Sequence, residues 1–134
     1  MANISITLNQ VSKTAVQVEN NNFDVVVDRS IEKGGTGKGL MGGQYLLLGI
    51  GGCFCSTFFA SAQSRDITVE GLKVIVNATL TDDLPKRFSA VSLSASYTSC
   101  SHPGEFKKLL NIAEKGCISV NTAKNGLQFD VSEA

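Results

Sequence analysis

The sequence is poor in several residue types on which whole classes of function depend. Its 134 residues include no tryptophan and a single histidine, His102. Lysine and arginine total 12, the same as aspartate plus glutamate, and no basic block occurs. Nucleic-acid binding depends on concentrated positive charge, so it is not expected. A cysteine–histidine hydrolase would rest on His102 alone, and beside Pro103 that residue is interpreted as a surface residue at a helix start.

Cysteine is also scarce, with residues only at positions 53, 55, 100 and 117. This is not the density of a small disulfide-rich secreted domain. No Cys-x-x-Cys pair occurs, and Cys53 and Cys55 would diverge on a helix, so a zinc site is rejected. The first ten residues lack a basic segment followed by an apolar one. No secretory signal is therefore expected, and a cytoplasmic location is predicted.

Charge is missing from the whole stretch between Gly39 and Ser64, which is long enough to span a bilayer. The stretch nevertheless contains six glycines, two glutamines and three serines, and strand-like sequence surrounds it. A helix from about Gln44 to Ser64, buried on nearly all sides, is preferred to a membrane span. Since a small domain buries such a helix most easily against a second copy, the stretch suggests a homodimer without membrane contact.

The remaining patterns predict a single α+β domain, residues 1–134, with antiparallel sheets. Apolar residues at helical spacing predict a second helix between Pro103 and Gly116. Asn125-Gly126 predicts a hairpin turn. Short β-branched runs and apolar–polar alternation predict strands at Ile4–Leu8, Thr14–Val18, Phe23–Asp28, Leu72–Leu80, Val91–Tyr97, Ile118–Ala123 and Leu127–Val131.

A glycine-rich connector, 29–43, precedes the long helix, and its residues 37–42 match the pattern G-x-G-x-x-G. A dinucleotide site would need these glycines directly after a strand, with an acidic residue about 20 positions further on. The predicted strand ends near Asp28, well before the glycines. The segment is therefore interpreted as a flexible connector.

The segment GIGGCFCSTFF, residues 49–59, places two cysteines just after a group of glycines. On a helix, residues two apart are rotated by about 200°, so Cys53 and Cys55 face nearly opposite sides. Gly49, Gly51 and Gly52 let another backbone or a substrate approach on the Cys53 side, which favours Cys53 as the reactive thiol. The residues alone leave open the commoner alternative, in which both cysteines are packed in the core.

Two segments together resemble the OsmC/Ohr family: QYLLLGIGGCFCSTFFASA, which contains Cys53, and AEKGCISVNT, which contains Cys117. The resemblance covers most of the chain. It implies the OsmC-like fold, an intertwined homodimer with the long helices buried at its centre, and thiol peroxidase activity on organic hydroperoxides. By position, Cys53 would be the peroxidatic cysteine and Cys117 the resolving one, forming a disulfide that an external dithiol reduces. No metal or prosthetic group is implied.

The chain departs from the family pattern where that pattern supplies charge. The family's glutamate before the first cysteine is absent; Gln44 lies in that region and offers a hydrogen bond without charge. The family's early arginine is absent too. The basic residues left as candidates for lowering the pKa of Cys53 are Lys13, Arg29, Lys33 and Lys38.

These departures keep a second hypothesis open. It is a non-peroxidatic member of the family, whose dimer-interface pocket binds a small apolar ligand and whose cysteines are structural. The retention of both Cys53 and Cys117 favours the peroxidase. The other two thiols have no role in either hypothesis: Cys55 is expected to pack, and Cys100, in a serine-rich turn, is expected to be exposed.

Overall fold

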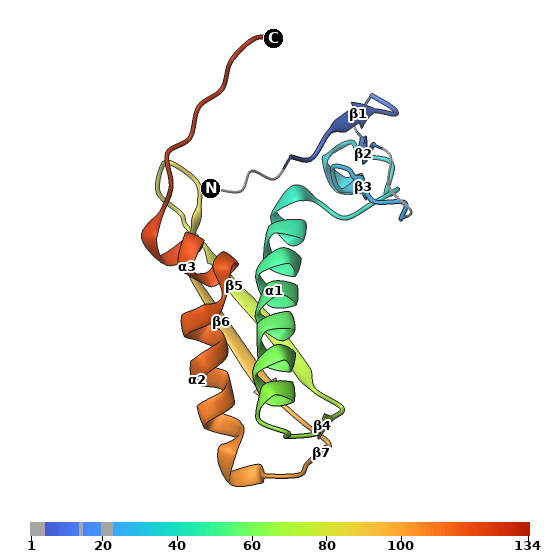
Figure 1. Cartoon of the computed structure of the whole chain (residues 1–134). Coiled ribbons are helices and arrows are strands. Elements are labelled where there is room, and N and C mark those ends of the chain that lie inside the picture. The colour runs from blue at the N-terminus through green and yellow to red at the C-terminus, as the bar shows by residue number, and fades with distance from the viewer. Residues whose placement is uncertain (1–4, 14, 20–22) are drawn as a thin grey trace. The chain divides into compact units, whose positions relative to one another are not determined.

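The computed structural model describes residues 5–13, 15–19 and 23–134. Within those ranges it is a mixed α+β structure with antiparallel strand pairs and three α-helices, which confirms the predicted class (Figure 1). Its contacts divide the chain into two compact units, residues 1–46 and 47–134.

The first unit contains a small antiparallel sheet. Its strands β1 (Leu8–Gln10), β2 (Val16–Val18) and β3 (Val26–Val27) pair in that order. They are shorter than the predicted strands, and β1 begins where its predicted strand ends. Ile4 and Thr14, the first residues of two predicted strands, lie outside the described residues.

Asp28 holds the glycine-rich connector in a defined conformation. The connector is therefore not the flexible segment that the sequence predicts. Asp28 is 4% exposed, and its carboxylate accepts hydrogen bonds from the backbone N–H of Arg29 (2.7 Å) and of Thr36 (3.0 Å). A Cβ at Gly35 or Gly39 would lie 1.7 or 1.8 Å from a backbone oxygen, so only glycine fits at either position. The segment includes a short 3₁₀ turn, η1 (Ile31–Lys33).

Helix α1 (Gly42–Ser64) is the predicted long apolar helix, beginning two residues earlier than expected. The Gln44 side-chain oxygen accepts a hydrogen bond from the Met41 N–H (2.9 Å) and so caps the first turn. By length and composition α1 could cross a membrane.

One side of α1 is buried within the chain and the other is not. The buried stripe repeats every four residues, through Ile50, Phe54, Phe58 and Ala62. On the opposite side Leu48 and Phe59 are each more than half exposed, and so is Leu46, which lies one turn before Ile50. The expectation of a helix buried on nearly all sides is therefore not met by one chain alone.

The second unit is built on a hairpin of β5 (Lys73–Leu80) and β6 (Phe88–Ser96). Along β5, half-buried Val74, Val76 and Ala78 alternate with exposed residues, as predicted. A second, shorter pair joins β4 (Val69–Glu70) to β7 (Ser99–Cys100). The hairpin thus presents one apolar face to the helices.

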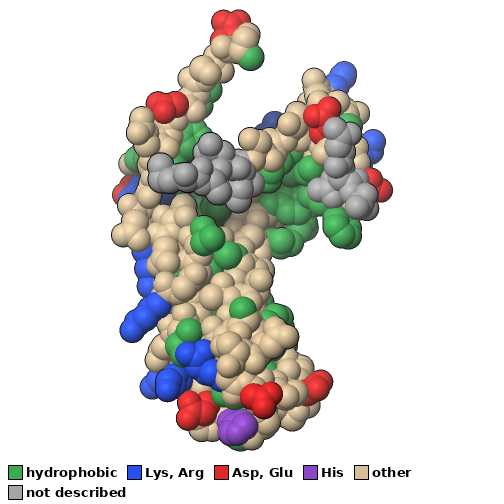
Figure 2. Space-filling model, in the orientation of Figure 1, with side chains coloured by type: hydrophobic (Ala, Val, Ile, Leu, Met, Phe, Trp, Pro, Cys, Tyr) green, Lys and Arg blue, Asp and Glu red, His purple; other side chains and the backbone are tan. Residues whose placement is uncertain are grey.

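Two helices cover that face and share one core. Helix α2 (Phe106–Gly116) follows a 3₁₀ turn, η2 (Pro103–Glu105), and matches the predicted second helix. Phe58 of α1 and Leu109 of α2 are fully buried, and the Phe58 and Phe106 rings meet edge-on with centroids 5.5 Å apart. The outer face of α2 carries exposed lysines (Figure 2): Lys107, Lys108 and Lys115.

Helix α3 (Ile118–Asn125) occupies the place of the predicted strand Ile118–Ala123, and that prediction is wrong. The Gly126 N–H donates to the Thr122 carbonyl (2.9 Å), and Gly126 has a φ of +70°. Asn125-Gly126 therefore ends a helix and does not turn a hairpin, because a left-handed glycine serves either purpose.

The second predicted strand of that hairpin, Leu127–Val131, is also absent from the structure. Residues 126–134 form no helix or strand. The apolar side chains that suggested the strand are all more than 60% exposed: Leu127, Phe129 and Val131. Once α3 replaces the first strand, the alternating segment has lost the neighbour with which it was predicted to pair.

Candidate active site

The structure brings Cys53 and Cys117, the two cysteines singled out in the sequence, into the same packed core. Cys53 is half-buried on α1, while Cys117 is fully buried between α2 and α3. Cys53 packs against the buried core cluster that contains Cys117, and each thiol affects the pKa of the other. All four cysteines are free, so the pair is a dithiol here. Two thiols that share one core and affect each other's pKa are a candidate disulfide pair.

Hydrogen bonds from the start of α3 hold the pKa of Cys53 below its ordinary value. The largest cause is the Ser119 hydroxyl, which donates to the Cys53 sulfur, and the Ser119 backbone N–H is the next. The Cys117 thiol and the Ile118 N–H add smaller contributions, while burial opposes them. Donors of this kind stabilise the thiolate over the thiol.

Cys117 has the opposite acidity. Burial is the main reason that its pKa is raised, and the neighbouring Cys53 raises it further. Its sulfur also accepts a hydrogen bond from the Val120 N–H (3.5 Å), so Cys117 is the N-cap of α3. Of the two thiols, Cys53 is therefore the more acidic and Cys117 the less acidic.

The glycines before Cys53 have different surroundings. A Cβ at Gly51 would lie 2.7 Å from a methyl group of Val76, so Gly51 allows β5 to approach α1 closely. Nothing lies within 4 Å of the corresponding positions at Gly49 and Gly52. Gly51 thus admits a side chain of β5, but it stands two residues before Cys53 and faces nearly the opposite side of α1, while Gly49 and Gly52 have no neighbour within 4 Å. The approach predicted on the Cys53 side is therefore not seen in the single chain.

The other candidate residues lie apart from this pair. Cys53 packs against the core cluster, whereas Cys55 is not among the residues packed against that cluster. Burial raises the pKa of the Cys55 thiol. Cys100 is half-buried in β7 and packs against the core, so the expected exposed turn is wrong. His102 is exposed at the start of η2, as predicted, with its Nδ1 2.9 Å from the Ser101 hydroxyl.

The residues considered as sources of charge belong to the first unit. The basic candidates, all exposed there, are Lys13, Arg29, Lys33 and Lys38. Gln44, in the region of the family's glutamate, uses its side-chain oxygen to cap α1. Among the described residues, no three His, Cys, Asp or Glu side chains are grouped so that they could hold a metal ion.

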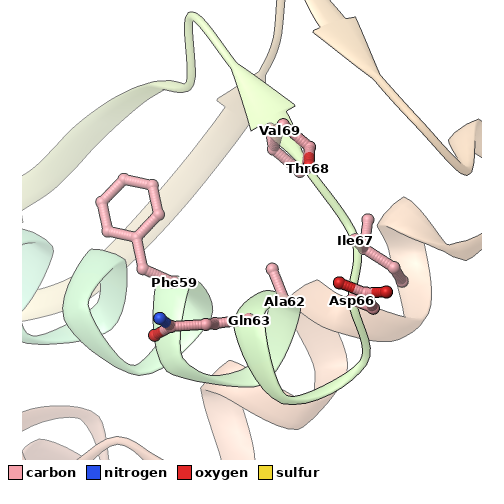
Figure 3. Close-up of a pocket in the computed structure, with 7 residues that line it drawn as sticks. All are labelled: Phe59, Ala62, Gln63, Asp66, Ile67, Thr68 and Val69. Carbon is pink, nitrogen blue, oxygen red and sulfur yellow. The ribbon is translucent and has the colours of Figure 1, made fainter.

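An open groove lies at the C-terminal end of α1. Figure 3 shows Phe59, Ala62 and Gln63 of α1 on one side, and Thr68 and Val69 at the beginning of β4 on the other. Its volume is about 340 Å³. None of the four cysteines lines it, so it is separate from the thiol pair.

Ser119 and its helix are the part of the site that the sequence analysis missed. Because residues 118–123 were predicted to be a strand, no helix N-terminus was expected beside Cys53. The sequence offered one sign of this helix, because Asn125-Gly126 is also a usual helix end, but no local pattern connected Ser119 to Cys53.

Comparison with known proteins supports this fold. Residues 35–132 match the sequence model of a family described as OsmC-like protein. No curated protein gives a significant match. Among solved structures, an OsmC like protein from Mycoplasma pneumoniae superposes with a TM-score of 0.76 at 19% identity, covering 93% of this chain and 89% of that one.

Two further solved structures carry names that refer to peroxides. An organic hydroperoxide resistance protein OsmC from Legionella pneumophila has a TM-score of 0.70 at 22% identity, covering 94% of this chain and 93% of that one. An organic hydroperoxide resistance protein from Elizabethkingia anophelis has a TM-score of 0.69 at 17% identity, covering 93% and 91%. At these identities the similarity is one of fold.

Proposed function

The chain belongs to the family of OsmC-like proteins, and from this premise we propose that it is a cysteine-based peroxidase that reduces organic hydroperoxides. Family membership, and structural neighbours named for organic hydroperoxide resistance, support a peroxide-related redox role. The observation that carries the finer proposal is the packing of Cys53 against the core cluster that contains Cys117, with the pKa of Cys53 lowered and that of Cys117 raised.

In the proposed reaction the Cys53 thiolate attacks the outer oxygen of the hydroperoxide. The O–O bond breaks, Cys53 becomes a sulfenic acid, and the departing alkoxide takes up a proton to leave as an alcohol. Cys117 then attacks the sulfenic sulfur and loses its thiol proton. A disulfide forms and water leaves. The peroxide is thereby reduced by two electrons at the expense of the two thiols.

An external dithiol completes the cycle. Its thiolate attacks the Cys53–Cys117 disulfide, passes through a mixed disulfide, and leaves both cysteines reduced. The protein's own part in this chemistry is carried by its two thiols and needs no metal or prosthetic group. The apolar surroundings of Cys53 favour hydrophobic peroxides, and a cytoplasmic location would keep the resting pair reduced.

We also propose that the working form is a homodimer in which a second copy covers α1. Leu48 and Phe59 are apolar, share one face of α1 and are more than half exposed in the single chain, on a helix without any charged residue. Burying them against a second copy would remove this surface from water. Since the opposite side of α1 already packs in the core, a membrane span is not proposed, and neither is a nucleic-acid partner.

A non-peroxidatic, ligand-binding dimer is the second candidate. It is favoured by Gln44, which lies where the family carries a glutamate and is used here to cap α1. In this alternative the cysteines are structural and an apolar pocket at the dimer interface holds a small ligand.

Turnover separates the two candidates. The purified chain, supplied with cumene hydroperoxide and excess dithiothreitol, is expected to consume many equivalents of peroxide. Cys53→Ser should abolish this turnover, while Cys55→Ser, a matched change on the same helix, should retain it. A wild-type chain without turnover, or equal loss in the two variants, would favour the ligand-binding protein.

A further inference from the structure

The two thiols of the candidate site differ sharply in their access to solvent. Cys117 is fully buried, like Phe58 and Leu109 at the centre of the core, whereas Cys53 is only half-buried on α1. A second copy of the chain could not make Cys117 more accessible. A thiol from outside can therefore reach the Cys53 sulfur directly, and it can reach the Cys117 sulfur only where the fold opens locally.

The junction of α2 and α3 closes over Cys117. The Cys117 sulfur accepts the Val120 N–H (3.5 Å) as the N-cap of α3, and the Val120 side chain packs against the core cluster. A Cβ at Gly116 would lie 3.4 Å from the Thr57 side-chain methyl, so the end of α2 rests on α1. The thiol is thus enclosed by parts of three helices.

Beyond this junction, exposed polar contacts tie α3 to α2. The Asn121 side-chain amide donates to the Lys115 carbonyl (3.0 Å), and the Lys124 ammonium lies 2.5 Å from the Glu114 carboxylate. No residue of α3 is itself fully buried. Since exposed contacts of this kind contribute little, the packing of Val120 is the main attachment of α3 to the core.

We propose that α3 shields Cys117, so that the outside reductant attacks the Cys53 sulfur only. This step rests on the proposed function, because it takes the Cys53–Cys117 disulfide as the oxidised form. The reductant's thiolate bonds to the Cys53 sulfur, the disulfide bond breaks, and Cys117 departs with the electron pair and takes up a proton. The second thiol of the reductant then attacks its own mixed disulfide, and Cys53 leaves as a thiolate.

Acidity alone would direct the reductant to the other sulfur. The pKa of Cys53 is lowered and that of Cys117 is raised, so Cys53 is the better leaving group and Cys117 the chemically preferred target. With a Brønsted coefficient of about 0.5, one pKa unit changes an exchange rate by a factor of about three. Local opening of a packed core reduces access by a larger factor, so access decides where the reductant attacks.

The test is the exchange of the reduced, full-length chain with glutathione disulfide, which runs the reductive half-cycle backwards. It is made in the Cys55→Ser chain, because Cys53 and Cys55 share one tryptic peptide and Cys117 lies on another. With Cys117→Ser added, peptide mass spectrometry should find glutathione on Cys53. With Cys53→Ser added, Cys117 should react at least about 100-fold more slowly.

Two controls separate shielding from low acidity. In urea the two thiols should react at comparable rates, because unfolding removes the cover. Raising the pH in the folded chain should not close the gap, because ionisation does not help a thiol that glutathione disulfide cannot reach. A Cys117 that reacts as fast as Cys53 in the folded chain would overturn the proposal.

A pair of variants tests the part played by α3. In the chain that lacks Cys53, Val120→Ala should loosen α3 from the core and raise the reactivity of Cys117 several-fold. Ile118→Ala, on the same turn but at a side chain 77% exposed, should leave that reactivity unchanged. Equal rates in the two variants would also overturn the proposal. Peroxide is absent throughout, so a wild-type chain that fails to reduce peroxide would count against the proposed function and leave this result intact.

Discussion

At the scale of single residues, two identical thiols acquire different roles from their neighbours. Cys53 receives donors from the start of α3, and Cys117 is buried. The sequence led to both cysteines, through their resemblance to a family motif and through the glycines before Cys53. It could not lead to Ser119, because a hydroxyl 66 positions after Cys53 acts on it only through the packing of α3 against α1.

The division of roles predicts the behaviour of a variant with one cysteine removed. In Cys117→Ser, an organic hydroperoxide should convert Cys53 to a sulfenic acid that accumulates, because the partner thiol is gone. Serine is a good N-cap, so α3 should persist. Dimedone labelling with peptide mass spectrometry measures this, with Cys55→Ser as a control in which no label builds up. Label on Cys100 in place of Cys53 would contradict the assigned roles.

At the scale of elements, α3 shows why a local pattern can mislead. Ile118 and Val120 are β-branched and Asn125-Gly126 is a strong hairpin signal, so a strand was the better local prediction. The helix is stabilised by bonds that the pattern does not reveal, including the Cys117 cap and the Thr122 hydroxyl donating to the Ile118 carbonyl (2.8 Å). By contrast, the strong periodicities of α2 and β5 gave correct predictions, because packing and pattern agree there.

The role of Gly126 as the end of α3 can be tested by substitution. Gly126→Ala forces a side chain into a φ of +70° and should destabilise the chain by about 1–3 kcal/mol. Gly104→Ala is the control, since nothing lies within 4 Å of its Cβ position and its φ is not positive. Urea unfolding measures both. Equal stability of the two variants would mean that Gly126 does not depend on its left-handed conformation.

At the scale of the whole molecule, the uncharged stretch from Gly39 to Ser64 gave the most informative prediction. Its composition indicated a helix that needs covering, and the single chain covers only the stripe that includes Phe54 and Phe58. No sequence pattern could reveal which face would stay exposed, because apolar residues lie all around α1. That face follows from where β5 and α2 pack.

The proposed dimer depends on this exposed face. Leu48→Asp should leave the fold intact, since Leu48 is 57% exposed, and should halve the mass measured by light scattering at micromolar concentration. Lys108→Asp, on the exposed outer face of α2, should remain dimeric. A wild-type chain that is already monomeric would contradict the proposed assembly.

The central claim is that Cys53 and Cys117 form a disulfide when the chain meets an organic hydroperoxide. Peptide mapping by mass spectrometry after a short, stoichiometric pulse of cumene hydroperoxide tests it directly, with hydrogen peroxide for comparison and Cys53→Ser as control. The account predicts a rapid Cys53–Cys117 disulfide that the organic peroxide forms faster than hydrogen peroxide does. A Cys53 that stays reduced through a large excess of peroxide would contradict it and favour the ligand-binding alternative.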